Sequence, residues 1–272
     1  MVILRTIYGI YYKCMRLDFS LLHSVPGPRQ EVIRYEQDGP SGLLSDEEAQ
    51  LFLRDGYFIV QQAAPTDVVD QTRRYLDEVY FDLQAVSKRS DDWRCHFELD
   101  FDRLSDGPVE HGKLLELLFC SPSIMARARD LLGPAIRGIF YTQIALRTPL
   151  AKVKSDEHAE SLNTGRTDYH IDGQANDAGT RFPDHWTLQI GIALSDQTVD
   201  NAGNFTVFPG AHLHDWTNYP SMKKDNCLPD VGPAKQLLLR SGDAVFAHVL
   251  LPHRGVCFVT NYIQFTVLTR IY

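Results

Sequence analysis

The pattern of hydrophobic and polar positions changes near residue 136. Before that point, apolar residues recur at spacings of three and four, which is typical of amphipathic helices. After it, short runs of β-branched and aromatic residues alternate with Gly, Pro, Asp and Asn, which is typical of strands and turns. The sequence therefore predicts a helix-rich first half and a mainly β second half.

Capping signals divide the first half into elements. The capping box Ser45-Asp46-Glu47-Glu48 predicts a helix to about Arg54, and Asp55-Gly56 predicts its end. A strand is expected at Tyr57-Phe58-Ile59-Val60. Two further helices are expected, one capped by Thr66-Asp67 with Val69, Tyr75, Val79 and Phe81 near one stripe, and one running from Ser121-Pro122 to Gly133-Pro134.

The second half predicts strands at 138–146, 187–194, 203–208, 236–239, 243–249 and 262–271. Many short strands after a helical half favour a mainly β fold, a barrel or double-sheet jelly roll buttressed by helices. We expect an N-terminal arm at 1–44, rich in Pro, Gly and charge from residue 24. One domain is expected at 45–272, helix-rich over 45–135, with the barrel core at 136–272.

Composition narrows the class of protein. The chain has 44% hydrophobic and 23% charged residues, as soluble globular proteins do, and its net charge of -8 argues against nucleic-acid binding. Five cysteines without CxxC spacing predict reduced thiols in an intracellular, cytoplasmic protein. The sequence contains no run of 18 apolar residues, so it predicts no membrane span. The basic, apolar start to Arg16 predicts a packed segment, with organelle targeting as the alternative, and the sequence assigns no oligomeric state.

Candidate chemistry begins with His170-Ile171-Asp172. On an extended strand, alternate side chains face the same way, so both end residues can bind one metal ion. A distant second histidine would complete the two-histidine, one-carboxylate triad of non-heme Fe(II) oxygenases, which leaves positions open for small molecules. The spacing therefore predicts a metalloenzyme that handles dioxygen.

Five blocks of the second half, in this order, resemble the phytanoyl-CoA dioxygenase family: Tyr169–Gly173, Gly191–Asp196, Gly203–His212, Ser241–Val245 and Pro252–Gly255. The resemblance extends from about 45 to 272. It implies a double-stranded β-helix (jelly-roll, cupin-like) and Fe(II) bound by His170, Asp172 and His253. It also implies 2-oxoglutarate and O2 as co-substrates, and oxidation of a C–H bond in a small molecule, usually hydroxylation, with release of succinate and CO2.

Three histidines near these blocks need separate interpretations. His253 comes after the Gly242-Asp243 turn and a strand, as the family's distal ligand does. His248 lies within the apolar strand and is expected to be a buried structural residue. His212 is expected to bond to backbone, and Asn204 to hold its loop through side-chain bonds to backbone.

One position departs from the family. The arginine expected eleven residues after the distal histidine, which binds the distal carboxylate of 2-oxoglutarate, is Gln264 here. Arg147, which shares a strand face with Gln143 near the co-substrate, or Arg103, is expected to compensate. Arg270 shares the face of Gln264 but lies roughly 20 Å along the strand. The alternatives are another oxo acid, a cupin-type isomerase or oxygenase, and a non-catalytic iron-binding protein.

The substrate itself is not readable from the sequence. The charged loop 152–167 is expected to act as a lid, and His158 and Trp216 to contact substrate. Lys223-Lys224 is a candidate receiver of an anionic substrate, with a solvated loop tip as the ordinary alternative.

Overall fold

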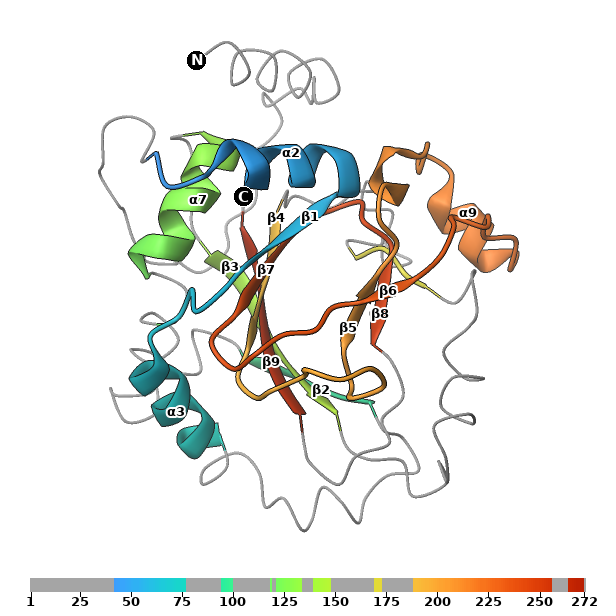
Figure 1. Ribbon diagram of the computed structural model, residues 1–272. Helices are drawn as coiled ribbons and strands as arrows, with labels where there is room; N and C mark the ends of the chain where they lie inside the picture. The colour runs from blue at the N-terminus through green and yellow to red at the C-terminus, as the bar shows by residue number, and fades with distance from the viewer. Residues whose placement is uncertain are drawn as a thin grey trace, which may run out of the picture. The chain divides into compact units, whose positions relative to one another are not determined.

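The computed structural model describes residues 42–76, 118, 121–133, 169–172 and 188–255, together with the backbone of 94–99, 139–147 and 264–271. The chain divides into two compact units, Met1–Val32 and Ile33–Tyr272, and all described residues belong to the second. Within this unit, helices accompany two antiparallel sheets (Figure 1). The domain boundary at 44/45 stays a prediction.

In the described residues the larger sheet has the strand order β1-β7-β4-β9-β3-β2, and the smaller sheet the order β6-β5-β8. The strands of the larger sheet are β1 (Tyr57–Val60), β2 (Arg94–Leu99), β3 (Ile139–Arg147), β4 (Leu188–Ala193), β7 (Ala244–His248) and β9 (Gln264–Ile271). Those of the smaller sheet are β5 (Phe205–Val207), β6 (Lys235–Gln236) and β8 (His253–Gly255).

An apolar core joins the two sheets. Side chains from β1, β4 and β7 meet side chains on and beside β5 and β6, and the cluster comprises Tyr57, Ala193, Val245, Ala247, Val207, Leu237, Leu239 and Leu251. Residues of the larger sheet that share a face with these therefore occupy its inner face, because side chains alternate along each strand.

Two cross-strand rows on this inner face matter for the site. One row runs through Tyr57, Ala247, Gln189, Arg270 and Tyr141, each directly opposite the next. Six residues along β9, a second row places Gln264 opposite Arg147 and Arg147 opposite Arg94. At about 3.3 Å per residue the two rows lie roughly 20 Å apart.

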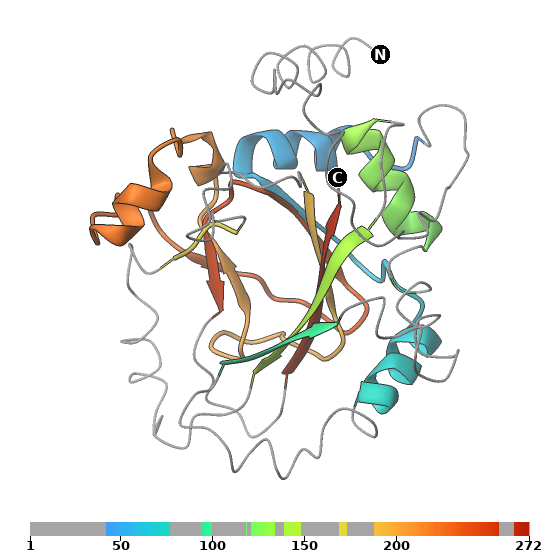
Figure 2. The ribbon, with the colours of Figure 1, turned by 180° about the vertical axis from the view of Figure 1, so that it is seen from behind.

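Three helices flank the larger sheet: α2 (Asp46–Asp55), α3 (Thr66–Tyr75) and α7 (Pro122–Leu132). Figure 2 shows α3 and α7 on the side away from the smaller sheet. The Ser45 capping box is present, and Gly56 ends α2 in a left-handed conformation (φ 82°). Ser121 caps α7. The predicted cap of α3 is wrong, because Pro65 precedes the helix, Thr66 is already helical, and no side chain caps it.

The predicted strands agree with the structure to within a few residues, except near 236–239. There the ladder covers only Lys235–Gln236, and beyond it Leu239 makes only an isolated bridge with Gln197. Strands β2 and β8 were not predicted at these bounds. Val79, Phe81 and Pro134 lie outside the described residues. Among the described residues no helix is long and apolar enough to cross a membrane.

Candidate metal centre

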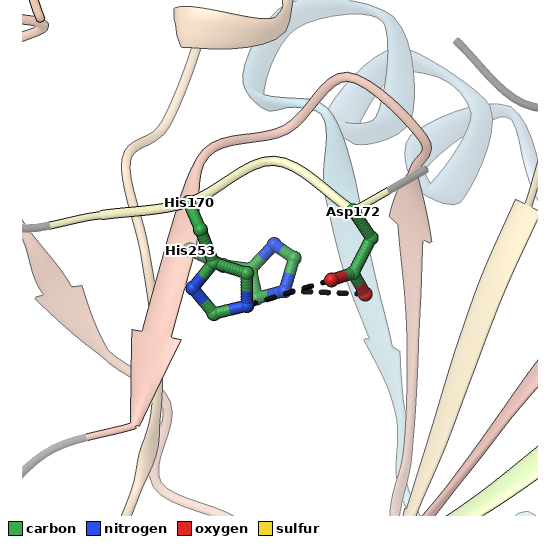
Figure 3. A group of neighbouring side chains, drawn as sticks. All are labelled: His170, Asp172 and His253. Carbon is green, nitrogen blue, oxygen red and sulfur yellow. Dashed lines mark ion pairs between the residues drawn. The ribbon is translucent and has the colours of Figure 1, made fainter. Parts of the chain in front are cut away.

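His170, Asp172 and His253 converge on one point (Figure 3). One potential ligand atom from each lies within 4.8 Å of the others. His170 Nε2 is 3.5 Å from Asp172 Oδ1, and His253 Nε2 is 3.5 Å from Asp172 Oδ2. Two imidazole nitrogens and a carboxylate oxygen at this separation fit a divalent first-row metal ion such as Fe(II).

Backbone pairing brings the two distant ligand segments together. His170 N donates to His253 O at 3.0 Å, and His253 N donates to His170 O at 2.9 Å, which forms an isolated antiparallel bridge. Strand β8 begins at His253 and pairs with β5, so this histidine is held from both sides. Between the first two ligands, Ile171 N donates to the hydroxyl of Tyr219 at 2.9 Å.

Outer hydrogen bonds orient two of the three ligands. His253 Nδ1 lies 2.9 Å from Leu251 O, which can only accept, so Nδ1 carries the proton and Nε2 keeps its lone pair for a metal. Gln189 Nε2 donates to Asp172 Oδ2 at 3.2 Å. Gln189 is only 3% exposed, so this bond is sheltered from water and fixes the carboxylate.

The local electrostatics favour ligand forms that bind metal. Burial alone would raise the pKa of Asp172, but the neighbouring His253 and His170 together hold that pKa well below its usual range. Burial, with the nearby His253, lowers the pKa of His170 despite its hydrogen bond to Asp172. An ionised carboxylate beside a neutral imidazole is what a metal ion requires, because ligands must be deprotonated.

Burial divides the centre into a closed and an open side. The His253 side chain is 6% exposed and that of Asp172 is 15% exposed, whereas that of His170 is 39% exposed. Access for small molecules is therefore on the His170 side.

His248 and His212, which were expected to be structural, both contact backbone atoms. His248 Nδ1 accepts from Leu250 N at 3.0 Å, and burial lowers its pKa to about 3. His212 Nε2 lies 3.2 Å from Leu53 O, as its predicted backbone bond requires. Asn204 holds its loop as expected, since it accepts from Ala202 N and donates to Gln197 O and Leu237 O.

The predicted co-substrate residues are spread over the inner face. Arg147 lies directly opposite Gln264, so these two positions are neighbours across the ladder. Gln143 lies opposite Leu268 on one side and Glu98 on the other. It is four residues along β3 from Arg147, on the side toward the row that contains Gln189. Arg103 lies outside the described residues.

The predicted substrate residues have different positions. Trp216 is 3% exposed, its indole Nε1 donates to Ala211 O at 2.9 Å, and it packs in a core cluster with Tyr169 and Tyr219. It stands behind the ligand-bearing segment, a position that favours support over direct contact with substrate. His158 and the expected lid 152–167 lie outside the described residues.

Four residues near the centre were not predicted from the sequence. Gln189 is a polar residue within a strand that is buried along its length, and that contrast was a usable signal. The Tyr219 hydroxyl and the Leu251 carbonyl carried no such signal. The position of Arg270 opposite Gln189 also had no signal in the sequence, because the register of β9 on β4 is a tertiary property.

Several solved structures are similar to this chain in fold. The α-ketoglutarate-dependent carbocyclase SnoK from nogalamycin biosynthesis has a TM-score of 0.56 at 18% identity, covering 86% of each chain. HygX from Streptomyces hygroscopicus, with nickel and 2-oxoglutarate bound, has a TM-score of 0.53 at 13% identity, covering 84% of this chain and 86% of its own. The epimerase SnoN, in complex with Fe3+, α-ketoglutarate and nogalamycin RO, has a TM-score of 0.51 at 19% identity, covering 86% and 84%.

A search of curated protein sequences found no match. The family model of phytanoyl-CoA dioxygenase, in contrast, matches residues 52–258, which is most of the chain and includes all three potential ligands. This match confirms the predicted enzyme class, a non-heme dioxygenase dependent on Fe(II) and 2-oxoglutarate. The chain belongs to the phytanoyl-CoA dioxygenase family.

Proposed function

We propose that the chain oxidises a C–H bond of a small molecule, with His170, Asp172 and His253 as the Fe(II) ligands on a double-stranded β-helix. The convergence of these three side chains within 4.8 Å is the observation that carries the proposal. When bound, the iron supplies oxidation by dioxygen, coupled to conversion of 2-oxoglutarate to succinate and CO2.

The chain's own residues hold and shelter the centre. His253 presents Nε2 because Leu251 O engages its other nitrogen, and Asp172 stays ionised while Gln189 orients it. The closed side at His253 excludes water, and the more exposed His170 side admits the substrate. These contacts fix ligand geometry before any reactant arrives.

For the co-substrate, two arginines are candidates for the distal carboxylate of 2-oxoglutarate: Arg147, which lies opposite Gln264, and Arg270, which lies opposite Gln189 at the metal end. The backbone position of Arg147, directly opposite Gln264, puts an arginine on the strand next to the one that would carry the family's arginine. A guanidinium can hold a carboxylate through two parallel hydrogen bonds, which a glutamine cannot do. Gln143, four residues before Arg147 and on the same strand face, is the neutral partner in this proposal.

A second candidate follows from Gln264 itself. A chain that lacks the expected arginine could bind iron and use another oxo acid, act as a cupin-type isomerase or oxygenase, or bind without turnover. Succinate separates these functions, because an oxygenase that consumes 2-oxoglutarate releases it and the others do not.

The test is to add Fe(II) and then 2-oxoglutarate to metal-free protein under anaerobic conditions. The proposal expects a weak visible charge-transfer band that saturates with 2-oxoglutarate. Asp172→Ala should lose the band, and Asp200→Ala, which changes an exposed carboxylate in a turn, should keep it. Iron binding without a band in the unaltered protein would favour the second candidate.

For the primary substrate, we propose only a broad class of molecule. One structure of HygX holds hygromycin B, and one of SnoN holds nogalamycin RO, so both relatives bind elaborate small molecules. We extend only that class, a small organic molecule, to this chain. The scattered cysteines support a reducing, intracellular compartment, which fractionation of cells would test.

A further inference from the structure

We propose that Phe205 is a specificity-determining residue for the 2-oxo acid. Its ring forms an apolar wall against the carbon chain of the bound co-substrate and excludes chains that carry a branch. This role rests on the proposed function and deepens it, because it limits which 2-oxo acids the metal centre accepts.

The pairing of β5 with β8 places Phe205 beside the metal ligand His253. In this register Val207 lies opposite His253, and Phe205 lies opposite Gly255. Because Gly255 has no side chain, the Phe205 ring can lean toward its diagonal neighbour His253, which is within the reach of an aromatic side chain. The centroids of the two rings are 5.1 Å apart, at an interplanar angle of 44°. Phe205 therefore packs on the imidazole that presents a nitrogen to the metal.

Phe205 faces the space between the two sheets. It shares a strand face with Val207, which belongs to the apolar core that joins the sheets, and Phe205 itself packs against that core. Val207 is fully buried, whereas Phe205 stays partly exposed. An aromatic residue that is partly exposed beside a metal ligand has the character of a wall of a binding site, since such sites are lined mainly by apolar and aromatic side chains.

The carbon chain of the co-substrate has to cross this space. A 2-oxo acid chelates the metal at one end, and both candidates for its distal carboxylate, Arg147 and Arg270, lie on strands of the larger sheet. Phe205 comes from the smaller sheet, on the closed side of the centre, where the His253 side chain is 6% exposed. The chain that joins the two ends of the 2-oxo acid therefore passes in front of the ring, while the primary substrate enters on the open His170 side.

An aromatic ring in this position controls both affinity and size. Each methylene group removed from water tightens binding about fourfold, so contact with the methylenes of 2-oxoglutarate gives a measurable gain. Strand β5 is paired on both sides, with β6 and with β8, so the backbone that carries the ring is held in place. An added methyl group on the co-substrate then meets a packed wall, and overpacking of that kind is unfavourable.

The first experiment measures dissociation constants by calorimetry on Ni(II)-loaded protein. The ligands are 2-oxoglutarate and its 3-methyl and 4-methyl derivatives, which keep both carboxylates. Phe205→Ala should weaken 2-oxoglutarate binding about three- to tenfold, and it should lower the ratio of the methylated to the unmethylated dissociation constant about tenfold or more. Phe205→Leu should give an intermediate ratio.

Ile59→Ala is the matched control, because Ile59 is partly buried and packs against the same core from β1 in the larger sheet. It should leave the ratio of the two dissociation constants unchanged. An unchanged ratio in Phe205→Ala, or an equal fall of the ratio in Ile59→Ala, overturns the proposal.

The second experiment observes the ring itself by fluorine NMR of Zn(II)-loaded protein that carries 4-fluorophenylalanine. The Phe205 signal is assigned by its loss in Phe205→Leu. 2-Oxoglutarate should shift this signal more than oxalate does, because oxalate chelates a metal through two oxygens but has no carbon chain. A purely structural contact with His253 would respond equally to both chelators, and that result also overturns the proposal.

The two proposals fail in different ways. If the unaltered protein binds neither metal nor 2-oxo acid, the proposed function is wrong and the role of Phe205 falls with it. If it binds both and Phe205→Ala leaves the ratio unchanged, only the role of Phe205 is refuted. Circular dichroism of each variant confirms that a change in binding does not come from loss of fold.

Discussion

The two ends of the inner face of the larger sheet differ in how completely they present the residues that the family pattern implies. At one end, Gln189 reaches the carboxylate of a complete set of metal ligands. Roughly 20 Å along β9, the other end has Gln264 where the family's pattern expects arginine, with Arg147 and Arg94 in the same row. The metal end has the three ligand residues that the family pattern implies, whereas the other end departs from that pattern at Gln264.

This difference teaches that iron binding and co-substrate binding are separable in this fold. The metal ligands are positioned by an isolated backbone bridge and a few outer hydrogen bonds. An arginine that substitutes for the missing one at Gln264 would be positioned by the register of the strands. A substitution at the Gln264 end should therefore leave metal affinity unchanged, and a substitution among the outer partners at the metal end should act first on metal affinity.

The largest effect is expected from Asp172→Ala. Removal of the only carboxylate of the triad leaves two imidazoles, so affinity for Fe(II) and turnover should fall by more than about a thousandfold, in line with the loss of a charged ligand. Calorimetry with a divalent metal and succinate release give the two readouts. Full activity in this variant would refute the ligand assignment.

The next effect concerns the opposite end. If Arg147 anchors the co-substrate, Arg147→Gln should weaken 2-oxoglutarate binding by about 1.5–3 kcal/mol, the usual range for a hydrogen bond to a charged group, while metal affinity stays unchanged. Gln264→Arg should rescue it, because the two positions face each other across the ladder. Arg240→Gln, at an exposed site, serves as the control.

Arg270 sharpens this test because it lies opposite Gln189 at the metal end. If Arg270→Gln weakens 2-oxoglutarate binding and Arg147→Gln does not, the co-substrate anchor is Arg270 at the metal end and Arg147 is excluded.

A smaller effect is expected for Gln189→Leu. The leucine keeps the volume of the side chain but no longer donates to Asp172, so metal affinity should fall 10- to 100-fold, as is typical for loss of an outer partner. Isothermal titration with Zn(II) or Co(II) measures the change. An unchanged metal affinity would mean that the backbone bridge alone orients the carboxylate.

The smallest effect is expected for Tyr219→Phe. The buried N–H of Ile171 loses its acceptor, which should cost about 1–3 kcal/mol of unfolding free energy in a urea titration. Tyr169→Phe is the matched control, because the Tyr169 hydroxyl bonds to Pro229 O rather than to the ligand segment. Only Tyr219→Phe should also lower metal affinity.

The sequence predicted those parts of the fold whose causes are local. The Ser45 capping box and the left-handed Gly56 both appear where the residues themselves dictate them. The cap of α3 was mispredicted, since Thr66 and Asp67 are frequent caps but the chain uses Pro65. Strand β8 is only three residues long, too short to show a period of two.

In the candidate site too, residues in short motifs could be predicted, and residues placed by tertiary contacts could not. His170-x-Asp172 and His253 were found from spacing and resemblance, and the structure brings them together. Gln189, a polar residue in a buried strand, could be suspected of a special role but not matched to Asp172, and Tyr219 gave no signal, because both roles arise from contacts between segments distant in the chain. The proximity of Arg147 to Gln264 needed the pairing of β3 with β9.

The bridge between His170 and His253 has one more consequence, for the chain as a polymer. A metal ion held by residues about 80 positions apart acts as a removable cross-link that closes a long loop. In the simple chain model, a permanent link over such a length would remove about 4–5 kcal/mol of unfolded-state entropy. Chelation should therefore expose the intervening segment to proteases sooner than it disturbs the β1–β7 pair, whose strands lie outside or near the end of that loop.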